Sequence, residues 1–225
     1  MNMKRAKQTK FVSNESGPSN LFENEWLNRL TRTHIAIPVS MFFIYAAGLL
    51  YYAKIATDLS NLAIIGLFFA GTFVFTFVEY AMHRWLYHPP EDASEKYQEF
   101  TYTIHGHHHA YPKDKQRLAM PPLLAFAIGT VLLVSLKLIL DQYSFAFLAG
   151  FMVGYAMYLL VHYSVHMFKM PNNFLKALWI NHSIHHYADD DEVLYGVSSP
   201  LWDYVFGTVP KKKSMKGVEV RQKVS

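Results

Sequence analysis

The chain has 225 residues, of which 52 % are hydrophobic and only 17 % carry a charged side chain. A soluble domain has about 25 % charged residues, so this composition argues against an ordinary soluble enzyme and against a disordered chain. The sequence contains no cysteine, which excludes disulfides, cysteine-ligated iron–sulfur clusters, Cys-type zinc fingers and a cysteine nucleophile. The formal net charge is +4, and no basic face typical of a nucleic-acid-binding module is visible, so no nucleic-acid partner is predicted.

Four apolar stretches are long enough to cross a bilayer. A membrane-spanning helix needs about 20 predominantly apolar residues, and the sequence predicts such spans at about 35–55, 61–82, 121–140 and 145–166. The connections within the first pair and within the second pair are short. We therefore expect an all-α integral membrane protein with two helical hairpins and a helical, histidine-rich cap formed by the polar segments between and after them.

The distribution of basic residues predicts the orientation. Lys54 and Lys137 lie on or near one side, and all other lysines and arginines fall in the N-terminal segment, between the hairpins or after the last span. The positive-inside bias then places both termini and the histidine-rich segments in the cytosol, at a bacterial inner membrane or the endoplasmic reticulum. We divide the chain into a leader (1–34) that is partly disordered or an interfacial helix, a membrane domain (35–210) and a basic tail (211–225).

Ten of the twelve histidines fall into four groups, and the predicted topology brings all four to the same side of the membrane. The groups lie in HRWLYH after the second span, HGHHH between the hairpins, HYSVH at the end of the fourth span and HSIHH just beyond it. The candidate metal ligands are His83, His88, His105, His108, His109, His162, His166, His182, His185 and His186.

The spacings within these groups suit helices. Residues i, i+3 and i+4 share one face of a helix, so three of the groups can each direct two or three imidazoles at one point. His83 and His88 are an i, i+5 pair, which aligns less well, and Pro89–Pro90 must end their helix. We expect a distorted last turn there. His107 breaks the triplet spacing and His34 is isolated, so neither is predicted to be a ligand.

Ten imidazoles exceed the coordination sphere of one first-row metal, so we predict a site for two metal ions. Imidazole ligation fits iron, zinc or copper, and the sequence does not separate them. Carboxylates are sparse nearby, which argues against a ferritin-like site. Glu79 lies one turn before His83 and is a candidate to orient a ligand histidine without touching the metal. No catalytic residue beyond the metal ligands is predicted.

Taken as a set, the histidine motifs resemble the fatty acid hydroxylase superfamily, the integral-membrane histidine-box enzymes that include sterol desaturases. The resemblance covers about residues 77–210. The segments HGHHHAYPKDKQRLAMPP (His105–Pro122) and SPLWDYVFGTVP (Ser199–Pro210) are most similar to the fatty acid 2-hydroxylases. Many fungal and animal 2-hydroxylases carry an N-terminal cytochrome b5 domain, whereas the 34 residues before the first predicted span are too few for one and hold no His-Pro-Gly-Gly haem motif.

The resemblance implies a di-iron centre, held by the ten histidines, that activates O2 and inserts oxygen into a C–H bond of a lipid chain. It implies 2-hydroxylation of a fatty acyl group of a sphingolipid or another lipid, with zinc able to replace iron in purified protein. It also implies a lipid substrate in the bilayer and a separate electron donor of the cytochrome b5, ferredoxin or reductase type. The chemistry agrees, because an acyl C–H bond offers no polar group to attack and a redox metal is needed.

Alternatives stay open at this point. Within the superfamily they are sterol desaturation, sterol methyl oxidation, and carotenoid or alkane hydroxylation. A membrane zinc hydrolase is an alternative of another class, but it needs about three histidines and a general base and leaves the other histidines unexplained. A metal transporter would need polar groups along its spans, and the predicted spans lack a polar path.

Overall fold

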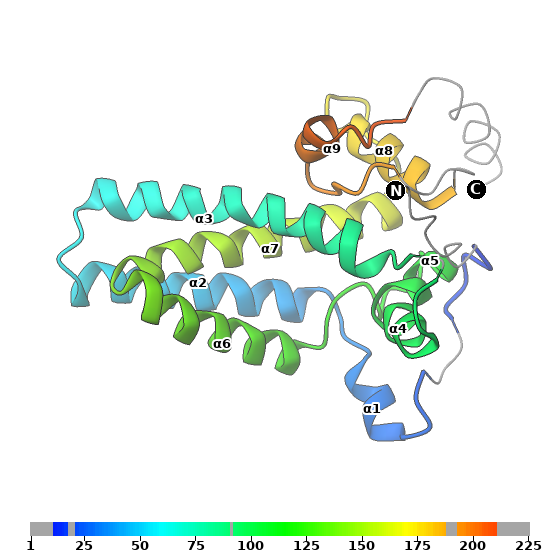
Figure 1. Ribbon diagram of the computed structural model, residues 1–225, viewed down its shortest axis with the longest axis horizontal. Coiled ribbons are helices and arrows are strands. Elements are labelled where there is room, and N and C mark those ends of the chain that lie inside the picture. The colour runs from blue at the N-terminus through cyan, green and yellow to red at the C-terminus, as the bar shows by residue number, and fades with distance from the viewer. Residues whose placement is uncertain (1–10, 18–20, 91, 188–192, 211–225) are drawn as a thin grey trace. The chain divides into compact units, whose positions relative to one another are not determined.

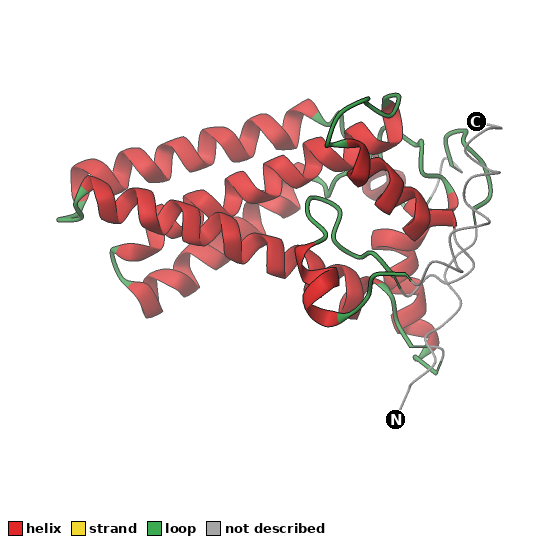
Figure 2. Cartoon of the chain, turned by 90° about the horizontal axis from the view of Figure 1, so that it is seen from above, coloured by secondary structure: helices red, strands yellow, loops and turns green. Residues whose placement is uncertain are grey.

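The computed structural model describes residues 11–17, 21–90, 92–187 and 193–210 (Figure 1). The first ten residues of the predicted leader and the predicted basic tail lie outside these ranges. The described residues form helices and loops, and no strand is assigned to them (Figure 2). Two compact units share the chain. We call residues 1–21, 79–115 and 161–225 the histidine unit, and residues 22–78 and 116–160 the hairpin unit.

The hairpin unit is built on long apolar helices that match the predicted spans. These are α2 (Ala36–Ala56), α3 (Asn61–Ala81), α6 (Pro122–Leu140) and α7 (Tyr143–Met167) (Figure 1). Each is long and apolar enough to cross a membrane, and the candidate span that begins with α3 continues through η1 (Met82–Tyr87) to Tyr87. The prediction of an all-helical chain with four spans is confirmed. The last residues of α3 and α7 belong to the histidine unit.

The core of the hairpin unit joins α2, α6 and α7. Phe42 on α2 is 2 % exposed, Ala125 on α6 is 4 % exposed and Leu148 on α7 is fully buried, and all three belong to the same apolar cluster. The outward faces are apolar as well, with Leu62 80 % exposed and Leu138 83 % exposed. Large apolar side chains on both the buried and the exposed face of a helix are expected where lipid replaces water as the surroundings.

α3 and α7 approach closely at two glycines. A Cβ atom added to Gly71 would lie 1.9 Å from the carbonyl oxygen of Phe147, and one added to Gly150 would lie 1.8 Å from that of Phe68. The hydroxyl of Thr72 donates to the carbonyl of Gly150 at 3.0 Å across the same contact. Small residues let membrane helices pack at short backbone distance, where van der Waals contacts and interhelical hydrogen bonds hold them together.

Gly71→Ala is therefore expected to destabilise the hairpin unit by about 1–3 kcal/mol, because α3 and α7 must separate to admit the methyl group. Gly66 lies on the same helix with no atom within 4 Å of an added Cβ, so Gly66→Ala is the matched control and should be neutral or slightly stabilising. Thermal unfolding of both variants in detergent measures the difference. Equal midpoints for the two variants would contradict this contact.

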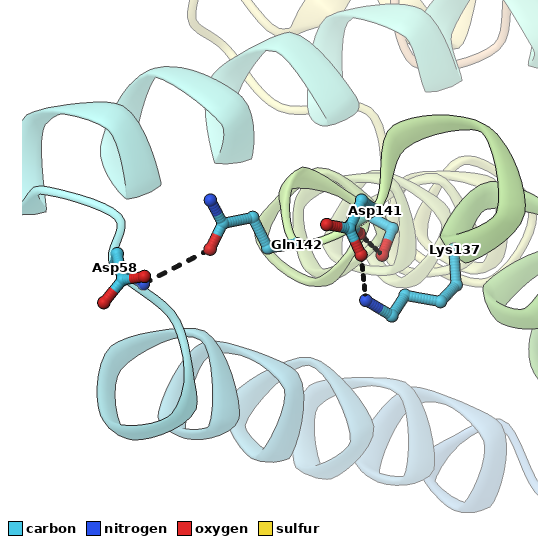
Figure 3. A network of polar contacts seen from close by, with 5 residues as sticks. Asp58, Lys137, Asp141 and Gln142 are labelled. Atoms are coloured by element: carbon cyan, nitrogen blue, oxygen red, sulfur yellow. Dashed lines mark hydrogen bonds and ion pairs between the residues drawn. The ribbon is translucent and has the colours of Figure 1, made fainter.

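The turns of the two hairpins lie together at one end of the hairpin unit. The backbone N–H of Asp58, between α2 and α3, donates to the side-chain Oε1 of Gln142, between α6 and α7, at 3.2 Å (Figure 3). Lys137, in the last turn of α6, pairs with Asp141 of the second connection, and Lys54 lies in the last turn of α2, next to the first connection. The two lysines that the sequence sets apart from the other basic residues therefore share this end.

The leader contains a shorter helix than its sequence pattern suggests. The amphipathic segment LFENEWLNRL predicts an interfacial helix, and the structure forms α1 over Glu25–Leu30 only. Asn24 caps it, because its side chain accepts a hydrogen bond from the N–H of Trp26 at 2.8 Å. Trp26 is 73 % exposed, and the interfacial position of this helix stays a prediction.

The histidine unit consists of short helices and the ends of two long ones. Its own elements are η1 (Met82–Tyr87), α4 (Glu95–Thr101), η2 (Tyr102–Gly106), α5 (His107–Ala110), α8 (Lys176–Tyr187) and α9 (Leu201–Phe206). η1 and η2 are π-helical turns. η1 continues α3 directly, and it is the distorted turn that the i, i+5 spacing of His83 and His88 predicts. A π-helix bonds i to i+5 and is frequent at functional sites, and here the two imidazole centroids lie 5.1 Å apart.

Candidate metal centre

The structure gathers the ten candidate ligands into two groups of five. The first cluster contains His83, His88, His105, His109 and His185, and the second cluster contains His108, His162, His166, His182 and His186. Within each cluster, one ring nitrogen from every residue lies within 4.8 Å of the others. His34 and His107 belong to neither cluster. All ten residues lie in the histidine unit.

The histidine triplets divide between the two clusters. On α8, His182 and His186 belong to the second cluster and His185 to the first. The segment 105–109 divides in the same way, with only His108 in the second cluster. Each triplet therefore directs two imidazoles, and not three, at one point. The reason is that positions i+3 and i+4 are separated by about 100° around a helix, so adjacent histidines serve adjacent sites.

The ring nitrogens that face each other are spaced as ligands of one ion. The Nε2–Nε2 distances are 3.0 Å for His83–His105, 2.8 Å for His105–His109, 2.9 Å for His108–His162 and 2.7 Å for His166–His182. Two nitrogens bound at about 2.0–2.1 Å and at right angles to each other lie about 2.9 Å apart. The clusters therefore have the nitrogen spacing that a first-row metal requires.

Two ring-to-carbonyl hydrogen bonds define the nitrogen that faces the first cluster. His83 donates from Nδ1 to the carbonyl of Tyr195 at 2.6 Å, and His185 donates from Nδ1 to the carbonyl of Val193 at 2.8 Å. Because a carbonyl only accepts, Nε2 of each ring presents a lone pair. Nε2 of His185 and both ring nitrogens of His186 are buried with no hydrogen-bond partner. Buried lone pairs that converge need a shared cation, so this donor set fits metal ions.

Burial keeps the imidazoles in the form that binds metal. Loss of hydration lowers the pKa of His185 to about 4, although its bond to the Val193 carbonyl opposes that shift. It also lowers the pKa values of His105 and His109 well below the ordinary range, with repulsion from neighbouring imidazoles as a second cause. Neutral imidazole is the metal-ligating form of histidine, so no proton has to leave before an ion binds.

Two buried carboxylates hold a loop rather than a metal. This loop, Val193–Ser198, carries the carbonyls that bind His83 and His185. Glu79 accepts hydrogen bonds from the N–H of Val197 at 2.7 Å and of Ser198 at 2.8 Å, and also from the Ser198 hydroxyl.

The second carboxylate, Asp203, binds the same loop at the N–H groups of Tyr195 and Gly196. The sequence singles out Glu79 because it lies one turn before His83. Nothing local to Asp203 distinguishes it, and only its place in the SPLWDYVFGTVP segment could have drawn attention to it.

Comparisons with known proteins cover most of the chain. Residues 68–208, which include both clusters, match the family model for fatty acid hydroxylase. The chain is 38 % identical over 197 residues to the ceramide very long chain fatty acid hydroxylase scs7 of Schizosaccharomyces pombe, covering 86 % of this chain and 55 % of that protein. It is 36 % identical over 157 residues to the fatty acid 2-hydroxylase of Homo sapiens, covering 67 % and 41 %.

Two further comparisons extend over most of the matched protein. The chain is 34 % identical over 197 residues to the dihydroceramide fatty acyl 2-hydroxylase FAH2 of Arabidopsis thaliana, covering 86 % of this chain and 81 % of that one. A solved structure of full-length scs7p, in which only the hydroxylase domain is visible, has a TM-score of 0.72 at 33 % identity and covers 84 % and 71 %. The chain spans about half the length of the first two relatives. By its family match, its identity to these relatives and its fold, the chain belongs to the fatty acid hydroxylase family.

Proposed function

We propose that this chain is a membrane-bound di-iron hydroxylase that places a hydroxyl group on carbon 2 of fatty acyl chains of a sphingolipid or another lipid. The observation that carries the proposal is the pair of buried, five-imidazole clusters, whose neutral nitrogens converge at metal-ligand spacing. Oxygen, two electrons and two protons are consumed, and water is released with the hydroxylated lipid. An external donor of the cytochrome b5, ferredoxin or reductase type supplies the electrons.

Iron bound in the two clusters would supply the redox activation of O2 that an unactivated C–H bond requires. The chain's own residues supply the binding and the positioning. The ten histidines divide into two sets of ligands, and the loop carbonyls of Val193 and Tyr195 fix two rings of the first set. Glu79 acts in this proposal by holding the far end of the same loop. Zinc, which also accepts imidazole, would occupy the sites without supplying redox chemistry.

The acyl substrate is supported by the relatives and by the fold. All three named relatives are fatty acid or fatty acyl hydroxylases, and four apolar helices place the chain in a membrane, where acyl chains are found. We further propose that the clusters face the cytosol. This orientation is supported by the concentration of lysine and arginine in the segments that carry the histidines.

Lipid analysis tests the proposed reaction. Cells that express the wild-type chain under ¹⁸O2 should gain 2-hydroxy fatty acids labelled with ¹⁸O after hydrolysis of total lipid. A His108→Ala/His185→Ala variant removes one ligand from each cluster and should reduce the product by at least about 100-fold. Labelled oxygen in a sterol or another lipid, with none at acyl carbon 2, would contradict the proposed substrate. Equal product from the variant would contradict the proposed site.

A further inference from the structure

We propose that Asp203 is a positioning residue of the first cluster. Its carboxylate fixes the Val193–Ser198 loop, and the loop in turn aims the rings of His83 and His185 at their ion. The inference rests on the proposed function to the extent that a metal ion is assigned to the first cluster. Asp203 itself is not assigned as a ligand, because its carboxylate is part of neither of the two groups of side chains that could hold a metal ion.

Asp203 is fully buried, and both of its carboxylate oxygens accept hydrogen bonds. Oδ1 accepts from the N–H of Tyr195 at 2.8 Å and from the hydroxyl of Thr208 at 2.7 Å. Oδ2 accepts from the N–H of Gly196 at 3.0 Å. A buried carboxylate is tolerated only when hydrogen bonds replace its hydration, and hydrogen bonds to a charged acceptor are the strong ones. The loop is therefore held firmly at two consecutive peptide groups.

The same loop residues bind the first cluster. Tyr195 donates its N–H to Asp203, and its carbonyl accepts the ring proton of His83 at 2.6 Å. Val193, two residues earlier, accepts the ring proton of His185 at 2.8 Å. A shift of this loop would move both carbonyls, and both rings would lose the bond that fixes their tautomer and direction. Such outer partners tune metal affinity without touching the metal.

The backbone between these two carbonyls is strained, and it is held by the same network. Leu194 has φ = +55°, a left-handed conformation that is uncommon for a residue other than glycine. Its N–H donates to the carbonyl of Thr208 at 3.0 Å, and the hydroxyl of Thr208 donates to Asp203. Strained backbone persists only where its surroundings over-determine it, and such strain is frequent at functional sites.

The loop packs so closely against the carboxylate of Asp203 that residue 196 has no room for a side chain. A Cβ atom added to Gly196 would lie 2.1 Å from the carbonyl of Ser199 and 2.8 Å from Oδ2 of Asp203. The backbone can approach the carboxylate closely only because this residue is glycine. The two carboxylates therefore divide the loop between them. Glu79 holds residues 197–198, and Asp203 holds the part whose carbonyl reaches a ligand.

The hydrogen bonds of Asp203 also connect, through Thr208, to the helix that carries His83. The hydroxyl oxygens of Thr208 and Tyr80 lie 3.1 Å apart, and Arg84 donates from Nη1 to the Tyr80 hydroxyl at 2.9 Å. Arg84 follows His83 directly in the chain. His83 is thus held through its ring by the loop and through its backbone by the helix, and Asp203 lies on the chain of contacts that connects the two.

Asp203→Asn is the sharpest test, since it keeps the shape of the side chain and places an amide NH2 against the N–H of Gly196. We expect the affinity of one of the two metal sites to fall by about 10–100-fold while the other keeps its affinity. Equilibrium dialysis of the full chain in detergent against buffered Zn²⁺, with metal counted by mass spectrometry, resolves the two steps. Asp114→Asn is the matched control, because Asp114 is also a buried carboxylate but lies 3.4 Å from His107, outside both clusters. This control variant should bind two ions with wild-type affinity.

The outcomes separate this inference from the proposed function. Two wild-type affinities in Asp203→Asn would overturn the positioning role and leave the function standing. Equal weakening of both sites, together with a lower melting temperature of the metal-free protein, would reveal a general stabilising residue and would also overturn it. A wild-type chain that binds no zinc would overturn the metal centre itself, and the function proposed for it.

Discussion

His108→Gln and His109→Gln are expected to abolish hydroxylation and to remove different metal ions, although the two residues are neighbours on α5. His109 belongs to the first cluster and His108 to the second. Each variant should retain about one ion per chain where the wild type holds two. Product formation should fall by more than about 100-fold in both, because loss of a ligand exceeds the loss expected for an outer partner.

His107 supplies the control for this pair. It precedes the two candidate ligands directly and is also buried, 2 % exposed, but its Nε2 lies 3.4 Å from Oδ2 of Asp114 rather than in a cluster. Glutamine can still donate a hydrogen bond to that carboxylate. His107→Gln should therefore keep both ions and most of the activity.

Two measurements on the full chain distinguish the three variants. Mass spectrometry gives the metal content of the purified protein, and lipid analysis gives the 2-hydroxy fatty acid in cells that express it. Loss of both ions from either His108→Gln or His109→Gln would mean that the clusters do not fill independently. Loss of an ion from His107→Gln would contradict the assignment of His107 as a residue that does not bind metal. Each result bears on a different residue of the HGHHH motif.

The spans and the set of histidines could be predicted because their signals are local. Nineteen residues without a charge between Ile35 and Ala53 predict a membrane helix in any context. The i, i+3 and i+4 spacings likewise reveal histidines on one helix face. The i, i+5 spacing of His83 and His88, followed by two prolines, was enough to predict the distorted turn that the structure forms as η1.

The role of the loop could not be predicted, because its contacts with His83 and Glu79 join residues that are far apart in the chain. The direction of His185 is set by Val193, and that of His83 by Tyr195, 112 residues away. Glu79 could be singled out by its position, but the Val197 N–H that it binds lies 118 residues away in the chain. No spacing rule connects residues so far apart, and only the folded loop brings them together.

Removing the metal ions is expected to destabilise the histidine unit strongly. A ligand that binds only the folded state adds about 2.7 kcal/mol of stability at 100 times its dissociation constant, so two ions held that tightly add about 5 kcal/mol. The structural reason is that each cluster concentrates buried lone pairs, such as Nε2 of His185, that have no hydrogen-bond partner. Without cations these nitrogens repel one another and attract water.

Treatment with a strong chelator in detergent should therefore lower the thermal midpoint and increase hydrogen exchange in α5 and α8, which carry five of the candidate ligands and His107. Amides of α2 and α6 belong to the hairpin unit, whose apolar core contains no histidine of either cluster, and should keep their protection. The His108→Ala/His185→Ala variant should show little response to the same treatment. Unchanged exchange in α5 and α8 after measured loss of both ions would mean that packing alone holds the imidazoles in place, and that the ions bind a site already rigid without them.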